Sequence, residues 1–159
     1  MTVEIREQDN VYLWALIRNI SHLMGRARDR ELAQYGLTVT QSAILSAVKR
    51  LAGTATPGSI AQFLYRESTT ISNTLIRMEK QGLVKRTRDP MRRREVRVTL
   101  TKSGEAALTD AGERDVINRA MTGLTAGESR ALIEAMKPLR DTLLGELGLA
   151  ADGRISSEL

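Results

Sequence analysis

The sequence predicts a mainly α-helical (α+β) fold in which one β-hairpin lies between two groups of helices. Apolar residues recur at three- and four-residue spacing through most of the 159 positions, as in amphipathic helices. Residues 96–100 instead alternate apolar and polar side chains, and they follow residues 83–87 after a basic loop, as the strands of a hairpin would. Threonines that suit helix N-caps precede several of the helical stretches.

The first predicted helix covers about residues 9–34, and its apolar side chains share one face: Leu13, Leu16, Ile17, Ile20, Leu23, Met24 and Ala27. A second helix follows, in which Thr38 and Gln41 have the spacing of a capping box. This helix is expected to end near Leu51.

A short helix and a longer one come next. Thr56 suits an N-cap with Pro57 at the first helical position, which predicts a helix to about Tyr65. After a tight break, Ser68 is expected to cap a helix that ends before Gly82, a residue well suited to the position after a helix.

The predicted hairpin follows directly, with strands at 83–87 and 96–100. A short helix, a tight turn and a second helix form a helix-turn-helix unit, whose second helix can enter the major groove of DNA. The hairpin makes this unit winged, and its loop becomes the wing. The sequence therefore predicts a winged helix-turn-helix unit at about residues 37–100.

Two long helices are expected after the wing. Thr101 would cap a helix over about residues 102–121, and Thr125 with Glu128 forms a capping box for a helix over about 126–147. The prediction is thus a single domain over residues 1–147. Its terminal helices, about 9–34 and 102–147, flank the winged unit, and a flexible tail covers 148–159.

Charge is concentrated in one segment of the chain. Residues 77–102 carry 10 Lys and Arg against 3 Asp and Glu, a net of +7, whereas residues 103–159 have a net of −4. A localised basic segment in a chain with a pI near 10.0 indicates a footprint for an anionic partner. The absence of cysteine, of a signal pattern and of a membrane-length apolar run favours a cytoplasmic protein without membrane attachment.

An enzyme is not expected. His22 is the only histidine and there is no cysteine, so neither a Cys–His pair nor a histidine metal cluster can form. We expect no catalytic residues, no metal site and no cofactor. His22 is interpreted as a packing residue or as part of a ligand pocket.

The predicted helix after Ser68 has two chemically different faces. Ile71, Leu75 and Met78 form the apolar side, as a helix on a core requires. The other side carries Thr69, Thr70, Ser72, Asn73, Ile76, Arg77 and Lys80. Asn73 has the groups to bind adenine, and Ile76 can contact a thymine methyl. The alternatives are an ordinary solvated face and a plain exposed isoleucine.

Arginines 92, 93 and 94 lie at the predicted tip of the wing. An arginine at a hairpin tip can enter a narrow minor groove, and its neighbours can meet phosphates. The alternative for Arg92, Arg93 and Arg94 is a solvated charged loop.

Residues 56–104 resemble the MarR family of winged-helix transcriptional regulators. The resemblance rests on STTISNTLIRMEKQGLVKR, the basic wing and VRVTLTKSG, and the helix order extends it over about residues 10–147. It implies a homodimer, built from the first and last two helices, that grips a pseudo-palindromic operator in double-stranded DNA. It further implies a repressor that a small, often phenolic, effector releases.

The resemblance also assigns individual residues. Recognition-helix contacts fall on Thr69, Thr70, Ser72, Asn73 and Arg77, and the minor-groove arginine falls on Arg94. The family commonly has an aspartate two residues before that arginine, where this chain has Arg92. Asp89 and Glu95 are the nearby acids that can replace it.

Two further points stay open at this stage. A pocket with Trp14, Arg18 and His22 could bind the effector, although each can equally be core or dimer interface. The alternative function is a winged-helix module that binds RNA or protein without operator specificity. Aromatic residues make up only 3% of the chain, which disfavours single-strand binding by stacking.

Overall fold

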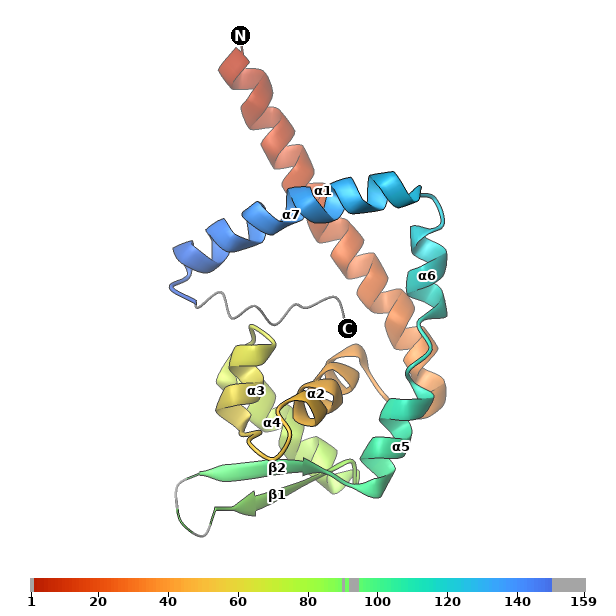
Figure 1. The fold of residues 1–159 in the computed structure, drawn as a ribbon, viewed down its shortest axis with the longest axis vertical. Helices are drawn as coiled ribbons and strands as arrows, with labels where there is room; N and C mark the ends of the chain where they lie inside the picture. Colours follow the sequence, from red (N-terminus) through yellow and green to blue (C-terminus); the bar gives the residue numbers. More distant parts are fainter. Residues whose placement is uncertain (1, 90, 92–94, 150–159) are drawn as a thin grey trace. The chain divides into compact units, whose positions relative to one another are not determined.

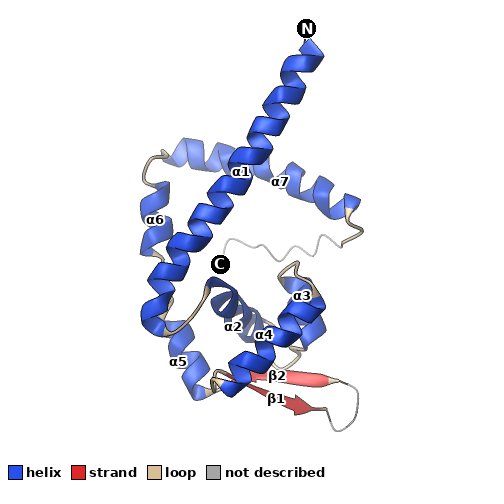
Figure 2. Ribbon diagram, turned by 180° about the vertical axis from the view of Figure 1, so that it is seen from behind, coloured by secondary structure: helices blue, strands red, loops and turns tan. Residues whose placement is uncertain are grey.

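The computed structural model describes residues 2–89, 91 and 95–149, with the backbone alone for residues 2–6. The chain divides between Ile117 and Asn118 into two compact units, which are described separately below. The elements are α1 (Thr2–Leu32), the 3₁₀ helix η1 (Ala33–Tyr35), α2 (Val39–Arg50), α3 (Pro57–Phe63), α4 (Ser68–Lys80), β1 (Val84–Arg88), β2 (Val96–Leu100), α5 (Lys102–Asp110), α6 (Asp115–Met121) and α7 (Ala126–Glu146) (Figures 1 and 2). The predicted mainly helical class with one two-stranded sheet is confirmed.

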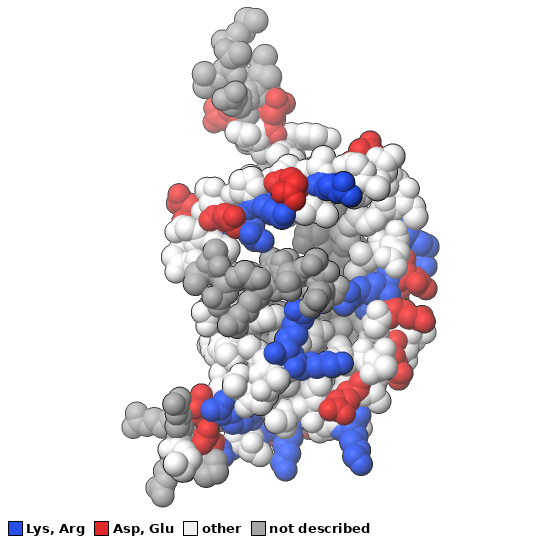
Figure 3. Space-filling view, viewed as in Figure 1, with Lys and Arg blue, Asp and Glu red and all other residues white. Residues whose placement is uncertain are grey.

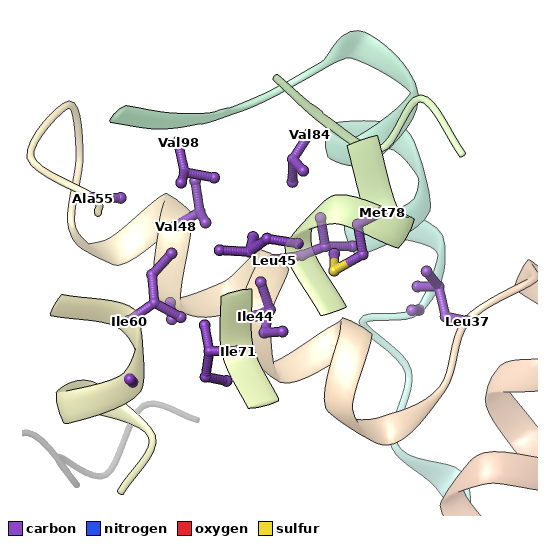
Figure 4. Packing of buried hydrophobic residues seen from close by; sticks show 14 of the residues in the cluster. Leu37, Ile44, Leu45, Val48, Ala55, Ile60, Ile71, Met78, Val84 and Val98 are labelled. Atoms are coloured by element: carbon purple, nitrogen blue, oxygen red, sulfur yellow. The ribbon is translucent and has the colours of Figure 1, made fainter. Parts of the chain in front are cut away.

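The hydrophobic core lies between α2, α3, α4 and the hairpin (Figure 4). Its fully buried side chains include Ile44, Leu45, Ile60, Ile71, Leu75, Met78, Val84 and Val98. Burying one such side chain contributes about 1.5–3 kcal/mol. This core therefore holds the helix-turn-helix and the hairpin together as one winged unit.

The hairpin forms in the predicted place. Val84 pairs with Leu100 and Arg88 with Val96, so β1 begins one residue later than the sequence suggested. The Val98 N–H donates to the Ala55 carbonyl at 2.9 Å. The loop before α3 is thereby attached to β2, which fixes the hairpin against the helices.

Threonine caps begin α2 and α3 as predicted. The Thr38 and Gln41 capping box is present, and the predicted cap Thr56 forms a second, unpredicted box with Ser59. The prediction for Ser68 is wrong, because the N-cap of α4 is Glu67 and Ser68 is already helical. The Glu67 carboxylate makes no capping hydrogen bond within the described part of the chain.

Gly82 ends α4 in the predicted way. Its φ of +74° lies in the left-handed region that glycine adopts without strain. The Leu83 N–H donates to the Met78 carbonyl at 2.9 Å and the Gly82 N–H to Glu79 at 3.0 Å, which closes the helix as a Schellman motif. The chain then turns directly into β1.

The single helix predicted for residues 102–121 is wrong. Thr101 does cap α5, but α5 ends at Asp110 and α6 begins at Asp115. The Arg28 guanidinium of α1 donates to the carbonyls of Ala111 and Glu113, at 2.6 and 2.7 Å. In a continuous helix these carbonyls would accept hydrogen bonds from N–H groups four residues further on.

The second unit contains α7, which begins as predicted with the Thr125 and Glu128 capping box. The hydrogen bond from the Thr125 N–H to the Glu128 carboxylate lowers the pKa of that carboxyl below its ordinary value. The helix ends at Glu146 with Leu147 as its C-cap. The predicted tail from residue 150 onwards lies outside the described residues.

Candidate nucleic-acid interface

The second helix of the helix-turn-helix, α4, is divided into two faces as the sequence predicted. Ile71, Leu75 and Met78 are fully buried in the core. The outward side chains are exposed at positions 69, 70, 73, 76, 77 and 80, and half-buried at Ser72. Contact between these outward residues and DNA stays a prediction.

Arg77 is oriented on this face by the helix itself. Its Nη2 donates to the Thr74 hydroxyl at 3.3 Å, and that hydroxyl donates to the Thr70 carbonyl at 2.9 Å. Thr74 is buried, so the hydroxyl gives the guanidinium a fixed partner. A pre-oriented guanidinium loses less side-chain entropy when it binds a phosphate or a guanine.

The C-terminal end of α4 is attached to its neighbours by two polar contacts. The Glu79 carboxylate accepts from the Arg86 N–H at 2.9 Å and lies 3.8 Å from its guanidinium, which joins α4 to β1. The Gln81 side chain accepts from the Gln41 amide of α2 at 2.7 Å. The helix therefore has little freedom to rotate against the wing.

The base of the wing is held by an ion-pair cluster. Arg97 Nε donates to Asp89 Oδ2 at 3.2 Å, and its guanidinium lies 3.6 Å from the Glu95 carboxylate. Asp89 Oδ1 also accepts from the Met91 N–H at 2.8 Å, and the Asp89 N–H donates to the Glu95 carbonyl at 2.9 Å. Asp89 and Glu95 thus stabilise the base of the wing where the expected aspartate is missing.

Arg97 is the centre of this cluster, and it was not among the predicted site residues. In the sequence it is one more arginine of a basic run, and only the pairing of Arg88 with Val96 brings it beside Asp89. Its Nη1 also approaches the Gly53 carbonyl, at 3.5 Å, in the loop before α3. A basic residue near the start of β2 and an acid after β1 would have been the signal.

Arg92, Arg93 and Arg94 lie outside the described residues. Among the described residues of the basic segment 77–102, the exposed basic side chains are Arg77, Lys80, Lys85, Arg88 and Lys102. Figure 3 shows Lys and Arg side chains along the hairpin edge of the molecule. This edge therefore presents positive charge even without the three wing-tip arginines.

The three candidate effector residues lie on an exposed part of α1. The Arg18 guanidinium carbon is 4.8 Å from the centroid of the Trp14 ring, a cation–π contact. Trp14 is 60% exposed, and Arg18 and His22 are exposed as well. The structure brings Trp14 and Arg18 together, and His22 follows one helical turn further on.

Other kinds of site find no support in the described part of the chain. Within residues 2–89, 91 and 95–149, no helix is both long and apolar enough to span a bilayer. Over the same residues, no group of His, Cys, Asp and Glu side chains is arranged to hold a metal ion. The exposed polar face of α4 beside a basic hairpin is the candidate nucleic-acid interface, and a helix-turn-helix followed by a hairpin defines a winged helix-turn-helix protein.

Comparisons with known proteins identify the family. The model of the MarR family matches residues 35–95. The HTH-type transcriptional regulator TtmR of Methylorubrum extorquens (strain PA1) is 32% identical over 131 residues, which are 80% of this chain and 65% of that protein. The chain therefore spans slightly less than two thirds of this relative's length.

Two solved structures extend the comparison to the fold. The organohalide-sensing RdhR-CbdbA1625 transcriptional regulator, in its 2,4-dichlorophenol-bound form, is 30% identical with a TM-score of 0.80, over 85% of this chain and 81% of that one. The S. aureus MepR–DNA complex is 26% identical with a TM-score of 0.74, over 81% and 96% of the two chains.

The chain belongs to the MarR family of winged-helix transcriptional regulators. Members of this family regulate transcription and are not enzymes, which confirms the prediction that this chain is not an enzyme.

Proposed function

We propose that this chain is a transcriptional regulator that binds a pseudo-palindromic operator in double-stranded DNA as a homodimer. One observation carries the proposal: the exposed polar face of α4 lies beside a basic hairpin, and both are fixed on one core. A helix that reads base edges must be held rigidly by the core, because misplacement by a fraction of an ångström breaks bidentate hydrogen bonds. The MepR–DNA complex shows a similar fold on DNA.

The roles of the residues follow from their chemistry. Thr69, Thr70, Ser72 and Asn73 lie in the first half of α4, which is the part of a recognition helix that reaches base edges. Asn73 can bind adenine through two hydrogen bonds, and Arg77 can bind guanine or phosphate. The wing arginines 92, 93 and 94 would enter the minor groove or neutralise phosphates.

A second copy of the chain is the proposed partner of the apolar surfaces. The first unit exposes large apolar side chains along α1, including Val11, Tyr12, Leu13, Leu16, Ile20 and Leu23. The second unit does the same along α7, at Leu132, Ile133, Leu139 and Leu143. Apolar faces of this extent are typical of protein interfaces, and two-fold symmetry matches two half-sites about one DNA turn apart.

Repression relieved by a small molecule is the proposed mode of regulation. The RdhR regulator, which has a similar fold, binds 2,4-dichlorophenol. Trp14, Arg18 and His22 combine aromatic rings with hydrogen-bond donors, which is the chemistry that a phenolic ligand needs. As a DNA-binding regulator the protein would act in the cytoplasm.

Fluorescence anisotropy tests the proposal. The protein is titrated onto duplex DNA from upstream of its own gene and onto a scrambled duplex, at several salt concentrations. We expect preference for the native duplex and a steep fall in affinity with salt, because each neutralised phosphate contributes a log–log slope of about −0.9. Arg94→Ala should weaken binding, whereas Arg130→Ala, an exposed arginine of α7, should not.

The other outcomes are informative in different ways. Equal binding to both duplexes, together with competition by single-stranded RNA, would support the RNA-binding alternative. Binding unchanged in Arg94→Ala but weakened in Arg92→Ala or Arg93→Ala would move the minor-groove role to another wing arginine. If 2,4-dichlorophenol, added to the same titration, weakens DNA binding, loss of this effect in Trp14→Ala would support the effector site.

A further inference from the structure

Arg28 is a buried charge that the proposed function does not use. It is only 8% exposed, on the last turns of α1, in a stretch where Arg26 and Arg30 are exposed. Burying a guanidinium is unfavourable unless most of its donors are paired. The partners of Arg28 therefore indicate why this arginine differs from its two neighbours.

All of these partners lie at one junction in the chain. Arg28 pairs with Glu31 on the same helix and donates to the carbonyls of Ala111 and Glu113, 83 and 85 residues further on. Glu31 Oε1 in turn accepts from the Val116 N–H at 3.0 Å. In both ribbon views the C-terminal end of α1 lies beside the junction of α5 and α6 (Figures 1 and 2).

The two charges match the two helix ends that they meet. Ala111 is the C-cap of α5, where unpaired carbonyls favour a cation, and Val116 lies in the first turn of α6, where unpaired N–H groups favour an anion. The Arg28–Glu31 pair therefore provides partners for a backbone carbonyl at the end of α5 and for a backbone N–H at the start of α6. A planar guanidinium can bond two carbonyls and a carboxylate at once, and an ammonium on a flexible stem cannot hold the same geometry.

We propose that Arg28 and Glu31 are positioning residues, which fix the angle at which α6 leaves the winged unit and thereby set the separation of the two recognition helices in the dimer. The inference rests on the proposed dimeric DNA binding. The junction can set the separation because the chain reaches its last helices only through it. A rigid junction would make the dimer select one half-site spacing. A loose junction would let it accept several.

Pulsed electron paramagnetic resonance can measure this separation directly. The chain has no cysteine, so a single Gln62→Cys substitution on the exposed surface of α3 places one spin label in each winged unit. We expect one narrow distance distribution in the otherwise unchanged protein. In Arg28→Lys and in Glu31→Gln, the distribution should broaden about twofold, because the fork of paired hydrogen bonds is lost. Arg26→Gln and Arg30→Gln are the matched controls and should leave it unchanged.

DNA binding gives the functional readout with the same variants. One base pair inserted between the half-sites turns one of them by about 35°, so the unchanged protein should bind this operator about tenfold more weakly. In Arg28→Lys that penalty should fall to about threefold or less, while dimerisation by sedimentation stays the same. A merely stabilising role would lower the melting temperature without changing the spacing preference.

The outcomes separate this inference from the function on which it rests. A narrow distribution and an unchanged insertion penalty in both Arg28→Lys and Glu31→Gln would overturn the positioning role. Absence of any dipolar signal in the unchanged protein, or equal binding to specific and scrambled duplexes, would instead overturn the proposed dimeric regulator. Arg28→Lys keeps the charge and Glu31→Gln keeps the shape, so at least one folded variant is expected.

Discussion

Gly104 lies in the first turn of α5, directly against the backbone that begins the hairpin. A Cβ at this position would lie 2.0 Å from the carbonyl oxygen of Leu83 and 3.5 Å from the Leu45 side chain. The Leu83 oxygen accepts from the Thr101 N–H at 3.2 Å, so it cannot retreat without losing that bond. The glycine that closes the Val-x-Leu-Thr-x-x-Gly run is therefore required by a close approach between α5 and Leu83.

We expect Gly104→Ala to lower the free energy of unfolding by about 2–3 kcal/mol, because an added methyl group forces backbone apart in a packed region. Urea unfolding followed by circular dichroism measures this. The control is Gly58→Ala in α3, whose Cβ would meet nothing nearer than 3.9 Å. It should be neutral or raise stability by about 0.5 kcal/mol. Equal stability of the two variants would contradict the steric explanation.

Ile76 is the second residue whose environment suggests a test. Within the described part of residues 37–100, only Ile76, 40% exposed, and Met91 expose a large apolar side chain. Ile76 lies on the same ridge of α4 as Asn73 and Lys80, at three- and four-residue spacing. An apolar side chain among polar residues that we propose to read bases is suited to a thymine methyl group.

We expect Ile76→Ala to weaken binding to the native duplex about fivefold, without a change in stability, because an exposed side chain contributes little to folding. Replacing the contacted thymine with deoxyuridine should weaken the unchanged protein by a similar factor. The same replacement should have no further effect on the variant, as a double-mutant cycle requires. Anisotropy with each thymine of one half-site replaced in turn measures the coupling, and additive effects at every thymine would exclude the contact.

At the scale of elements, α2 and α4 are connected through Gln41. The Gln41 side chain accepts from the Thr38 N–H at 2.9 Å and donates to Gln81 at 2.7 Å. We expect Gln41→Ala to lower the free energy of unfolding by about 1–2 kcal/mol, because a cap and a part-buried hydrogen bond are lost together. Thermal unfolding of this variant and of Gln62→Ala, an exposed glutamine of α3, measures the difference. A loss of the same size at both positions would contradict this role.

Local signals were sufficient to predict most elements. The caps at Thr38, Thr56 and Thr125 were correct because each depends only on residues up to three positions away. The break between α5 and α6 could not be predicted in this way. Arg28, which binds the carbonyls at this break, is distant in the sequence and looks there like any other charge of an exposed helix.

The same difference between local signals and contacts distant in sequence holds for the candidate site. The helical period alone predicted which side chains of α4 face the core, because Ile71, Leu75 and Met78 repeat at helical spacing. The roles of Asp89 and Arg97 depend on strand register, which brings residues together across the hairpin. A one-residue difference in register would turn Arg97 to the opposite face, so sequence could suggest the acids but not their partner.

At the scale of the whole molecule, the positive charge and the apolar surfaces belong to different parts of the sequence. Residues 77–102, with a net charge of +7, form the end of α4 and the hairpin. The exposed apolar side chains concentrate instead in α1 and α7. A protein that binds DNA through one part and a second copy through others would need this division, because charge disfavours an apolar interface and apolar groups gain little from phosphates.

The last prediction follows from that division. Ile20 lies in the middle of the apolar stripe of α1 and is 46% exposed in the single chain. We expect Ile20→Glu to convert the proposed dimer into monomers, because a buried carboxylate in each copy would face an apolar partner without a counter-ion. Sedimentation equilibrium measures the mass. Operator affinity should fall at least about a hundredfold, since one winged unit then binds without the second as a tethered partner.

Ser21→Glu is the matched control for charge, because it adds the same carboxylate to an adjacent exposed position about 100° around the helix. It should leave both the mass and the operator affinity close to those of the unchanged protein. Helix content by circular dichroism should be the same in all three proteins, since neither position is part of the core of the winged unit. A dimer that persists in Ile20→Glu would mean that α1 does not form the interface, and Leu132 and Ile133 of α7 would be tested next.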